Sequence, residues 1–192
     1  MSTASVTARP GAVLADLLPS SRVRDAALVL GGAALTGLAA QIAVPVPGSP
    51  VPVTGQTFAA LLVGTTLGAR RGFAALALYA AAGLAGVPWF AQGGSGASVS
   101  FGYVLGMLLA AAAVGALARR GADRSPLRMA GTMLLGEALV YAVGVPYLAF
   151  AAHLSATQAI AAGLTPFLLG DALKAALAMG ALPTAWKLTN KS

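Results

Sequence analysis

Apolar residues run along this chain in six segments, separated by shorter polar stretches or by stretches rich in proline and glycine. A helix that crosses a membrane needs about 20 apolar residues, with a range near 17–25. The pattern predicts an all-α integral membrane protein with six transmembrane helices. The predicted segments are 26–44, 55–69, 73–87, 101–118, 127–150 and 166–186.

The second and third segments are short for a full crossing. A re-entrant hairpin, which turns back inside the membrane, therefore stays open as an alternative for 55–69 and 73–87.

The composition indicates that these helices are surrounded by lipid and not by water. Of the residues, 58% are hydrophobic and 9% are charged, whereas a soluble domain carries roughly 25% charged residues. Five acidic and twelve basic side chains are too few to cover such an apolar chain. We therefore expect a multi-pass protein of the cell membrane. The net charge of +7 then anchors membrane loops and does not indicate a nucleic-acid partner.

The arginines and lysines of the loops set the orientation. They lie before the first segment, between the second and third, between the fourth and fifth, and after the sixth. The connections at about 45–54, 88–100 and 151–165 contain none. Because basic residues concentrate in cytoplasmic loops, six crossings with both termini in the cytoplasm satisfy the pattern, and an odd number does not.

The three base-free connections are rich in proline, glycine and small polar residues, and the third can include a short helix. Proline fixes the backbone in extended or turn conformations. Two interpretations stay open: the connections form a lid over a pocket at the outer face, or they are ordinary interfacial loops with Trp89 in the aromatic belt.

The first 24 residues lack the pattern of a signal peptide. Asp16 and Pro19 interrupt the apolar run 12–18, and the arginines follow this run instead of preceding it. We predict a cytoplasmic tail in which 12–18 form either a short helix on the membrane surface or simply part of the tail. The predicted regions are then the tail 1–24, the six-helix domain 25–188 and a second tail 189–192.

One acid and one base interrupt the sixth segment. With Thr165 as the cap and Pro166 at the first position of this helix, Asp171 and Lys174 lie about 8 and 12 Å along its axis. They share one helix face in the outer half of the membrane, where each charge costs up to about 2.5–3.5 kcal/mol. Either they form an ion pair that serves the fold alone, or they present opposite charges to a polar ligand from outside.

Glu137 is the other acid inside a predicted helix. It lies roughly 13 Å from Arg128 along the fifth segment, near the midplane. Such an acid faces the bundle interior or a subunit interface. A structural hydrogen bond and a role at a ligand are equally supported.

Several kinds of chemistry are disfavoured. The chain has no cysteine, which excludes disulfides and thiolate metal sites, and its single histidine, His153, argues against a histidine metal site. The motifs of P-loop ATPases, serine hydrolases and zinc proteases are absent from the sequence. We expect no enzymatic activity and no cofactor.

Three motifs together resemble the BioY family, the biotin-specific substrate-binding subunits (S components) of energy-coupling factor (ECF) transporters. They are P-V-T-x-Q-T at 52–57, LGARRG at 67–72 and PFxxGDxxK at 166–174, and the similarity extends over about 14–188. The resemblance implies a six-helix bacterial membrane protein that binds biotin with high affinity near the outer face. It also implies uptake of biotin in complex with a transmembrane coupling subunit and two ATPase subunits.

The resemblance also implies roles for individual residues. Asp171 and Lys174 fall on the ligand-binding acid and base of the family, which act either on separate groups of biotin or jointly. Further substrate-binding candidates are Thr54, Gln56, Gln92 and Tyr103. Docking on the coupling subunit is expected through small residues of the first helix, where close helix approach is possible; the candidates are Ala33, Gly37 and Ala40.

Two other functions stay open. The chain can be an S component for another small vitamin, or a solitary permease that works without partners.

Overall fold

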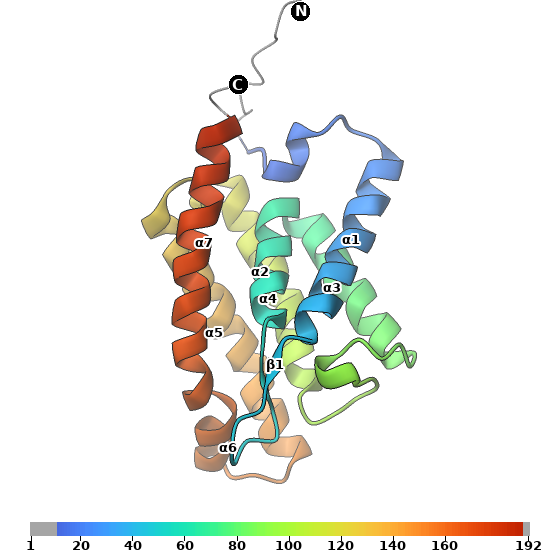
Figure 1. Ribbon diagram of the computed structural model, residues 1–192, viewed down its shortest axis with the longest axis vertical. Helices are drawn as coiled ribbons and strands as arrows, with labels where there is room; N and C mark the ends of the chain where they lie inside the picture. Colours follow the sequence, from blue (N-terminus) through green and yellow to red (C-terminus); the bar gives the residue numbers. More distant parts are fainter. Residues whose placement is uncertain (1–10, 190–192) are drawn as a thin grey trace, which may run out of the picture.

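Six long helices form the body of the protein in the computed structural model, which describes residues 11–189 (Figure 1). They follow the six predicted segments in order, so the all-α class is confirmed. Their bounds are α1 (Arg22–Ala40), α2 (Gln56–Leu67), α3 (Ala69–Leu84), α4 (Phe101–Arg119), α5 (Pro126–Ala151) and α7 (Leu168–Thr189).

Shorter elements occupy the connections. The first base-free connection forms an antiparallel pair of two-residue strands, β1 (Ala43–Val44) and β2 (Val53–Thr54), and its prolines lie between or beside them. The third contains the expected short helix, α6 (Ala156–Gly163). The remaining elements are the 3₁₀ turns η1 (Leu14–Leu17), η2 (Ala91–Gly93), η3 (Ala122–Arg124) and η4 (Thr165–Phe167).

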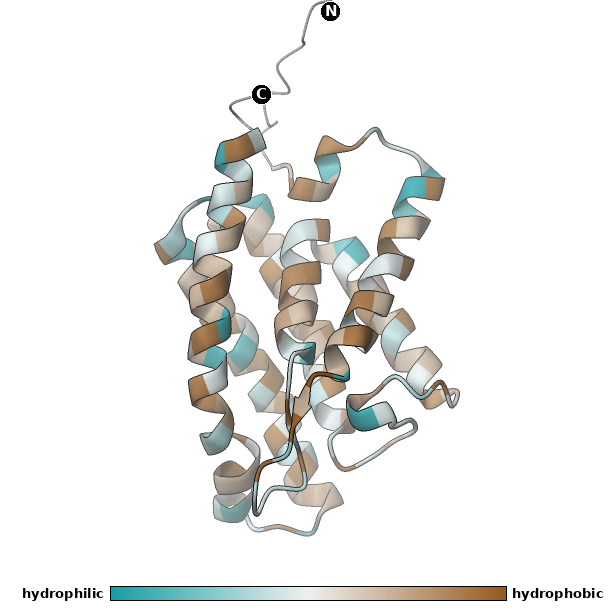
Figure 2. Cartoon of the chain, in the orientation of Figure 1, coloured by the Kyte–Doolittle hydropathy of each residue, from teal (hydrophilic) through white to brown (hydrophobic). Residues whose placement is uncertain are grey.

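Four stretches of the described chain are long and apolar enough to cross a membrane: α1, α4, α5 and Ala156–Thr189. Large hydrophobic side chains on the outside of these helices are exposed, among them Leu38, Phe150 and Leu169. Figure 2 shows hydrophobic residues distributed along the lengths of the helices. Such an apolar exterior is suited to lipid and not to water.

Helices α2 and α3 are shorter, with 12 and 16 residues. Gly68 joins them at a φ of 81°, a left-handed conformation that glycine adopts without strain. The other end of α2, at Gly55, lies against Ala39 near the end of α1, whereas Gly68 lies against Arg119 at the end of α4. The α2–α3 pair therefore turns at one end of the bundle and not halfway along it.

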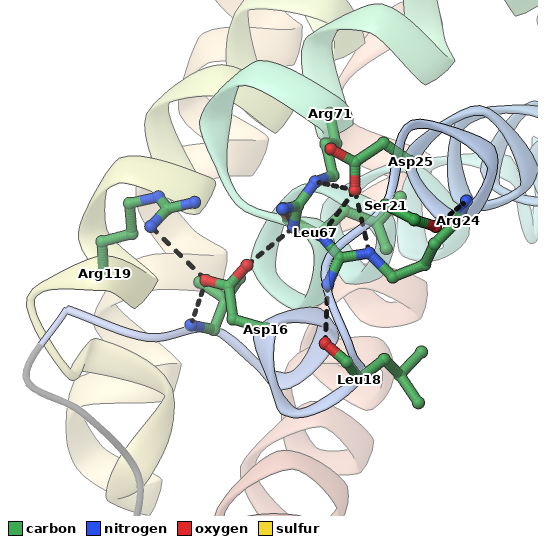
Figure 3. Close-up of polar contacts among 9 residues, drawn as sticks. Asp16, Leu18, Ser21, Arg24, Asp25, Leu67, Arg71 and Arg119 are labelled. Carbon is green, nitrogen blue, oxygen red and sulfur yellow. Dashed lines mark hydrogen bonds and ion pairs between the residues drawn. The ribbon is translucent and has the colours of Figure 1, made fainter.

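The segment before α1 is folded onto this end of the bundle. Asp16 of η1 accepts a hydrogen bond of 2.8 Å from Arg71, which also lies 3.1 Å from Asp25, and Arg119 lies 3.5 Å from Asp16 (Figure 3). Val13 is completely buried. Within the predicted tail, Val13 and Ala15 are thus buried against the bundle, whereas residues 18–20 are exposed. Residues 1–10 and 190–192 of the predicted tails lie outside the described chain.

Opposing effects act on Asp16. Burial alone would raise its pKa, but the hydrogen bonds from Arg71 and Val13 and the charges of Arg71 and Arg119 outweigh burial and hold the pKa below its usual value. The ionised carboxylate of Asp16 therefore joins η1 to α3 through Arg71 and to α4 through Arg119.

The end of α7 is attached at the same end of the bundle. The indole N–H of Trp186 donates a 2.5 Å hydrogen bond to Asp123 of η3, and the guanidinium of Arg124 lies 4.4 Å from the indole centroid. Burial raises the pKa of Asp123, although the bond from Trp186 opposes this. The described ends of the chain thus lie together, opposite α6 (Figure 1).

The small residues of α1 face the inside of the molecule. Ala33 and Ala40 are buried, and a Cβ atom on Gly37 would lie 3.1 Å from Trp89. Their small size lets α1 approach α3 and the α3–α4 connection (residues 85–100) closely. The prediction that they form a docking face is therefore corrected, because this chain itself covers them.

Candidate ligand-binding site

The acid and base of the last helix lie side by side. Their side chains are 10% and 13% exposed, and Lys174 Nζ lies 3.0 Å from Asp171 Oδ1. Their separation of three residues places them on one face of α7, as the sequence predicted. The start of the helix differs from the prediction, because Thr165 and Pro166 form the 3₁₀ turn η4 and α7 begins at Leu168.

Two other helices hold this Asp171–Lys174 pair. Lys174 Nζ donates a 2.7 Å hydrogen bond to Thr57 Oγ1 of α2, and the Tyr141 hydroxyl of α5 donates to Asp171 Oδ2. Each charge therefore has a partner besides the other. Such hydrogen bonds lower the cost of placing ionised groups in an apolar interior.

A pocket opens directly beside the Asp171–Lys174 pair. Counted out to its open mouth, and including solvent-filled space there, it encloses about 580 Å³. The first and second base-free connections contribute residues to its wall, which favours the lid interpretation for these two. The walls are formed by Val51, Pro52, Thr54, Gln56, Thr57, Phe90, Ala91, Ser98, Ser100, Phe101, Tyr103, Val104, Met107, Tyr141, Phe167, Asp171 and Lys174.

Five of the six predicted substrate-binding residues line this pocket: Thr54, Gln56, Tyr103, Asp171 and Lys174. Gln56 is 4% exposed, and its amide nitrogen has no hydrogen-bond partner among the described residues. A buried donor without a partner is costly, so this amide is available to an acceptor on a ligand. The Tyr103 hydroxyl instead donates to the Gly163 carbonyl at 2.7 Å and holds the third connection in place.

Gln92 is the exception. Its side chain is exposed, and its backbone has a φ of 59° in a tight turn. Its neighbours Phe90 and Ala91 line the pocket in its place. The prediction for Gln92 is corrected. The sequence indicates that this turn lies near the pocket, but it does not indicate which side chain of the turn points inwards.

The residues that sequence reasoning missed are the two partners of the charged pair. Thr57 belongs to the P-V-T-x-Q-T motif but was not singled out, so that motif held a usable signal. Tyr141 lies in a largely apolar segment, one turn after Glu137, and no local pattern marks it as a partner of the charged pair. Its role depends on how α5 crosses α7.

Glu137 is buried in α5 at 7% exposure, and neither carboxylate oxygen has a hydrogen-bond partner among residues 11–189. It faces the interior of the bundle but is not part of the pocket wall. Within the described chain, no group of three or more histidine, cysteine, aspartate or glutamate side chains is placed to hold a metal ion.

The fold and the pocket define a class: an all-α protein with apolar, membrane-length helices that enclose a site for a small molecule with both polar and apolar parts. The model of the BioY family matches residues 9–191. The chain therefore belongs to the BioY family.

Individual relatives agree with this assignment. The chain is 32% identical over 163 residues to the biotin transporter BioY2 of Lactococcus lactis subsp. cremoris, covering 83% of this chain and 88% of the relative. It is 35% identical over 139 residues to the biotin transporter BioY of Thermotoga maritima, covering 70% and 80%.

A solved structure has the same fold. The crystal structure of the S-component for biotin from an ECF-type ABC transporter superimposes with a TM-score of 0.77 and 22% sequence identity. The match covers 88% of this chain and 95% of the other.

Proposed function

We propose that this chain binds biotin in the pocket beside Asp171 and Lys174 and delivers it into the cell as the S component of an ECF-type transporter. The observation that carries the proposal is an acid and a base, 3.0 Å apart, in the wall of a mainly apolar pocket in a member of the BioY family. Biotin likewise combines apolar parts, its ring system and aliphatic chain, with polar ones, a ureido group and a terminal carboxylate.

The short distance between the two charges favours joint action on one end of biotin. The ureido and carboxylate groups lie at opposite ends of the extended molecule, so Asp171 and Lys174 cannot reach one each while they stay 3.0 Å apart. One edge of a ureido group offers an N–H donor next to a carbonyl acceptor. In our proposal Asp171 accepts from the N–H, Lys174 donates to the carbonyl, and hydrogen bonds to charged groups give the contact its strength.

The membrane orientation follows from the charged end of the bundle. The elements that carry basic residues, η3, the α2–α3 turn, the start of α1 and the end of α7, lie at the same end of the bundle as η1, opposite α6 (Figure 1). The positive-inside rule then places this end in the cytoplasm and the base-free connections outside. We propose six crossings of the cell membrane with both termini cytoplasmic, in which α2 and α3 count as full crossings because they turn at the charged end.

A transmembrane coupling subunit with two ATPase subunits completes the proposed transporter. Because Ala33, Gly37 and Ala40 are covered, the docking face is shifted to the open side of α1, where Ala27, Gly31 and Ala34 are exposed. A Cβ atom on Gly31 would meet nothing within 4 Å. Small residues on an exposed helix face allow another helix to approach closely.

Isothermal titration of the purified chain with biotin, riboflavin and thiamine tests the ligand. Heat with biotin alone supports the proposal, whereas heat only with another vitamin would make the chain an S component of different specificity. Uptake into liposomes that contain this chain alone would favour a solitary permease. Purification of the tagged chain with its membrane partners, with and without biotin, tests the proposed ECF complex.

A further inference from the structure

Gln41 connects the end of α1 to the α3–α4 connection. The two N–H groups of its amide are shared among three carbonyl oxygens, those of Gly37 at 2.9 Å, Trp89 at 3.1 Å and Phe90 at 3.2 Å from the nitrogen. Its amide oxygen accepts from the Gly93 N–H at 3.0 Å. An exposed glutamine thus uses both ends of its amide on backbone groups, three of which belong to a segment about 50 residues further along the chain.

The segment that Gln41 holds carries one wall of the pocket. Phe90 closes a turn in which its N–H donates to Gly94 at 2.9 Å and its carbonyl accepts from Gly93 at 3.1 Å. Its ring lines the pocket and packs edge-on against Tyr79 at 5.2 Å between centroids. The aromatic contact positions the ring, and Gln41 positions the backbone behind it.

Regular secondary structure contributes little to this part of the molecule. Between α3 and α4 the described backbone contains only the three-residue η2, in which Gln92 and Gly93 both have a positive φ. Trp89 adds a second attachment, because its indole N–H donates to the Tyr79 carbonyl at 3.0 Å and its ring packs against Gly37. Both attachments join the connection to α1 and α3.

We propose that Gln41 is a positioning residue that holds the Phe90 wall closed over the bound ligand by tying the α3–α4 connection to α1. The proposal rests on biotin being the ligand. Because Gln41 directly follows α1, a displacement of α1 would pull on the same bonds and loosen this wall. The closed state of the pocket and the position of α1 are therefore linked through the hydrogen bonds of Gln41, beside the packing of Trp89 on Gly37.

Matched substitutions test this role. Gln41→Asn withdraws the amide by one methylene from all four partners, whereas Gln92→Asn makes the same change on an exposed side chain of the same connection and preserves tolerance for a positive φ. Gln41→Glu keeps the acceptor for Gly93 but turns an ionised oxygen towards three carbonyl groups. We expect both Gln41 variants to release biotin about tenfold faster in a radiolabelled chase, and Gln92→Asn to stay within about twofold of the unaltered chain.

Hydrogen exchange without ligand supplies a second readout. Backbone amides of residues 85–96 should exchange faster in both Gln41 variants, while those of α4 and α5 stay unchanged. Equal exchange or equal biotin release in the Gln41 variants and the unaltered chain would overturn the proposal. If the unaltered chain does not bind biotin, the proposed function fails, and exchange still decides whether Gln41 holds the connection.

Discussion

Replacing Lys174 with methionine is the most direct test of the pocket. The change keeps an unbranched side chain, one atom shorter, but removes the bonds of 3.0 Å to Asp171 and 2.7 Å to Thr57. One hydrogen bond to a charged group contributes about 1.5–3 kcal/mol. Losing the bond from Lys174 to biotin should therefore weaken binding by about 10- to 150-fold, since each 1.4 kcal/mol corresponds to a factor of ten.

A second cost acts on the fold and must be separated from binding. Removing one member of a buried ion pair leaves the other uncompensated and costs about 3–5 kcal/mol when both are fully buried. Here the side chains are 10% and 13% exposed, and Asp171 keeps its bond from Tyr141, so we expect a lower Tm but a folded protein. Asp171→Asn, which retains the shape of the side chain, is the companion variant.

Isothermal titration with biotin and with biotin methyl ester identifies the ligand group that the base contacts. If Lys174 donates to the ureido carbonyl, Lys174→Met weakens both ligands by the same factor. If it contacts the carboxylate, the ester already lacks that interaction, and the substitution changes its affinity little. Unaltered biotin affinity in folded Lys174→Met and Asp171→Asn would refute the reasoning and make the pair purely structural.

The remaining predictions concern packing and the cytoplasmic end. Gly83→Ala places a methyl group in the space of the Phe90 ring, so titration should show weaker biotin binding and Tm should fall by the equivalent of about 1–3 kcal/mol; Gly180→Ala, with nothing within 4 Å of the new Cβ atom, is the neutral control. Burial raises the pKa of Asp123, so its stabilising contribution is lost as pH rises through the folded-state pKa. Asp123→Asn should match or exceed the Tm of the unaltered chain at pH 8, and a large loss there would contradict this. The lowered pKa of Asp16 has the opposite sign: its contribution is present above its unfolded pKa of about 3.9 and is lost as pH falls through the folded-state pKa. Asp16→Asn should therefore have a lower Tm at pH 7 and approach the unaltered chain near pH 3, whereas a constant difference would exclude this ion pair as the cause.

The long helices could be predicted because each leaves a one-dimensional signal. A run of apolar residues between charged or proline-rich stretches marks α1, α4, α5 and α7 regardless of how they pack. The segment before α1 gave no such signal. Asp16 interrupts its short apolar run, and the structure shows why: the carboxylate bonds to Arg71, 55 residues away.

The sequence reveals those site residues whose placement in a membrane helix has a high free-energy cost. Asp171 and Lys174 stand out because an apolar helix rarely carries charge. Small residues stand out less, and Ala33 and Gly37 show the consequence: their spacing correctly indicates a close contact but cannot say whether the neighbour is this chain or a partner.

The partners of the charged pair required the three-dimensional structure. Thr57 and Tyr141 are ordinary residues of α2 and α5 until those helices meet α7. There their hydroxyl groups supply the bonds that let two ionised side chains remain beside an apolar pocket. A ligand that contacts the same charges must then use the hydrogen-bonding positions of Asp171 and Lys174 that Tyr141 and Thr57 do not occupy. The specificity of the site is therefore set by these two hydroxyl groups as well as by the two charges.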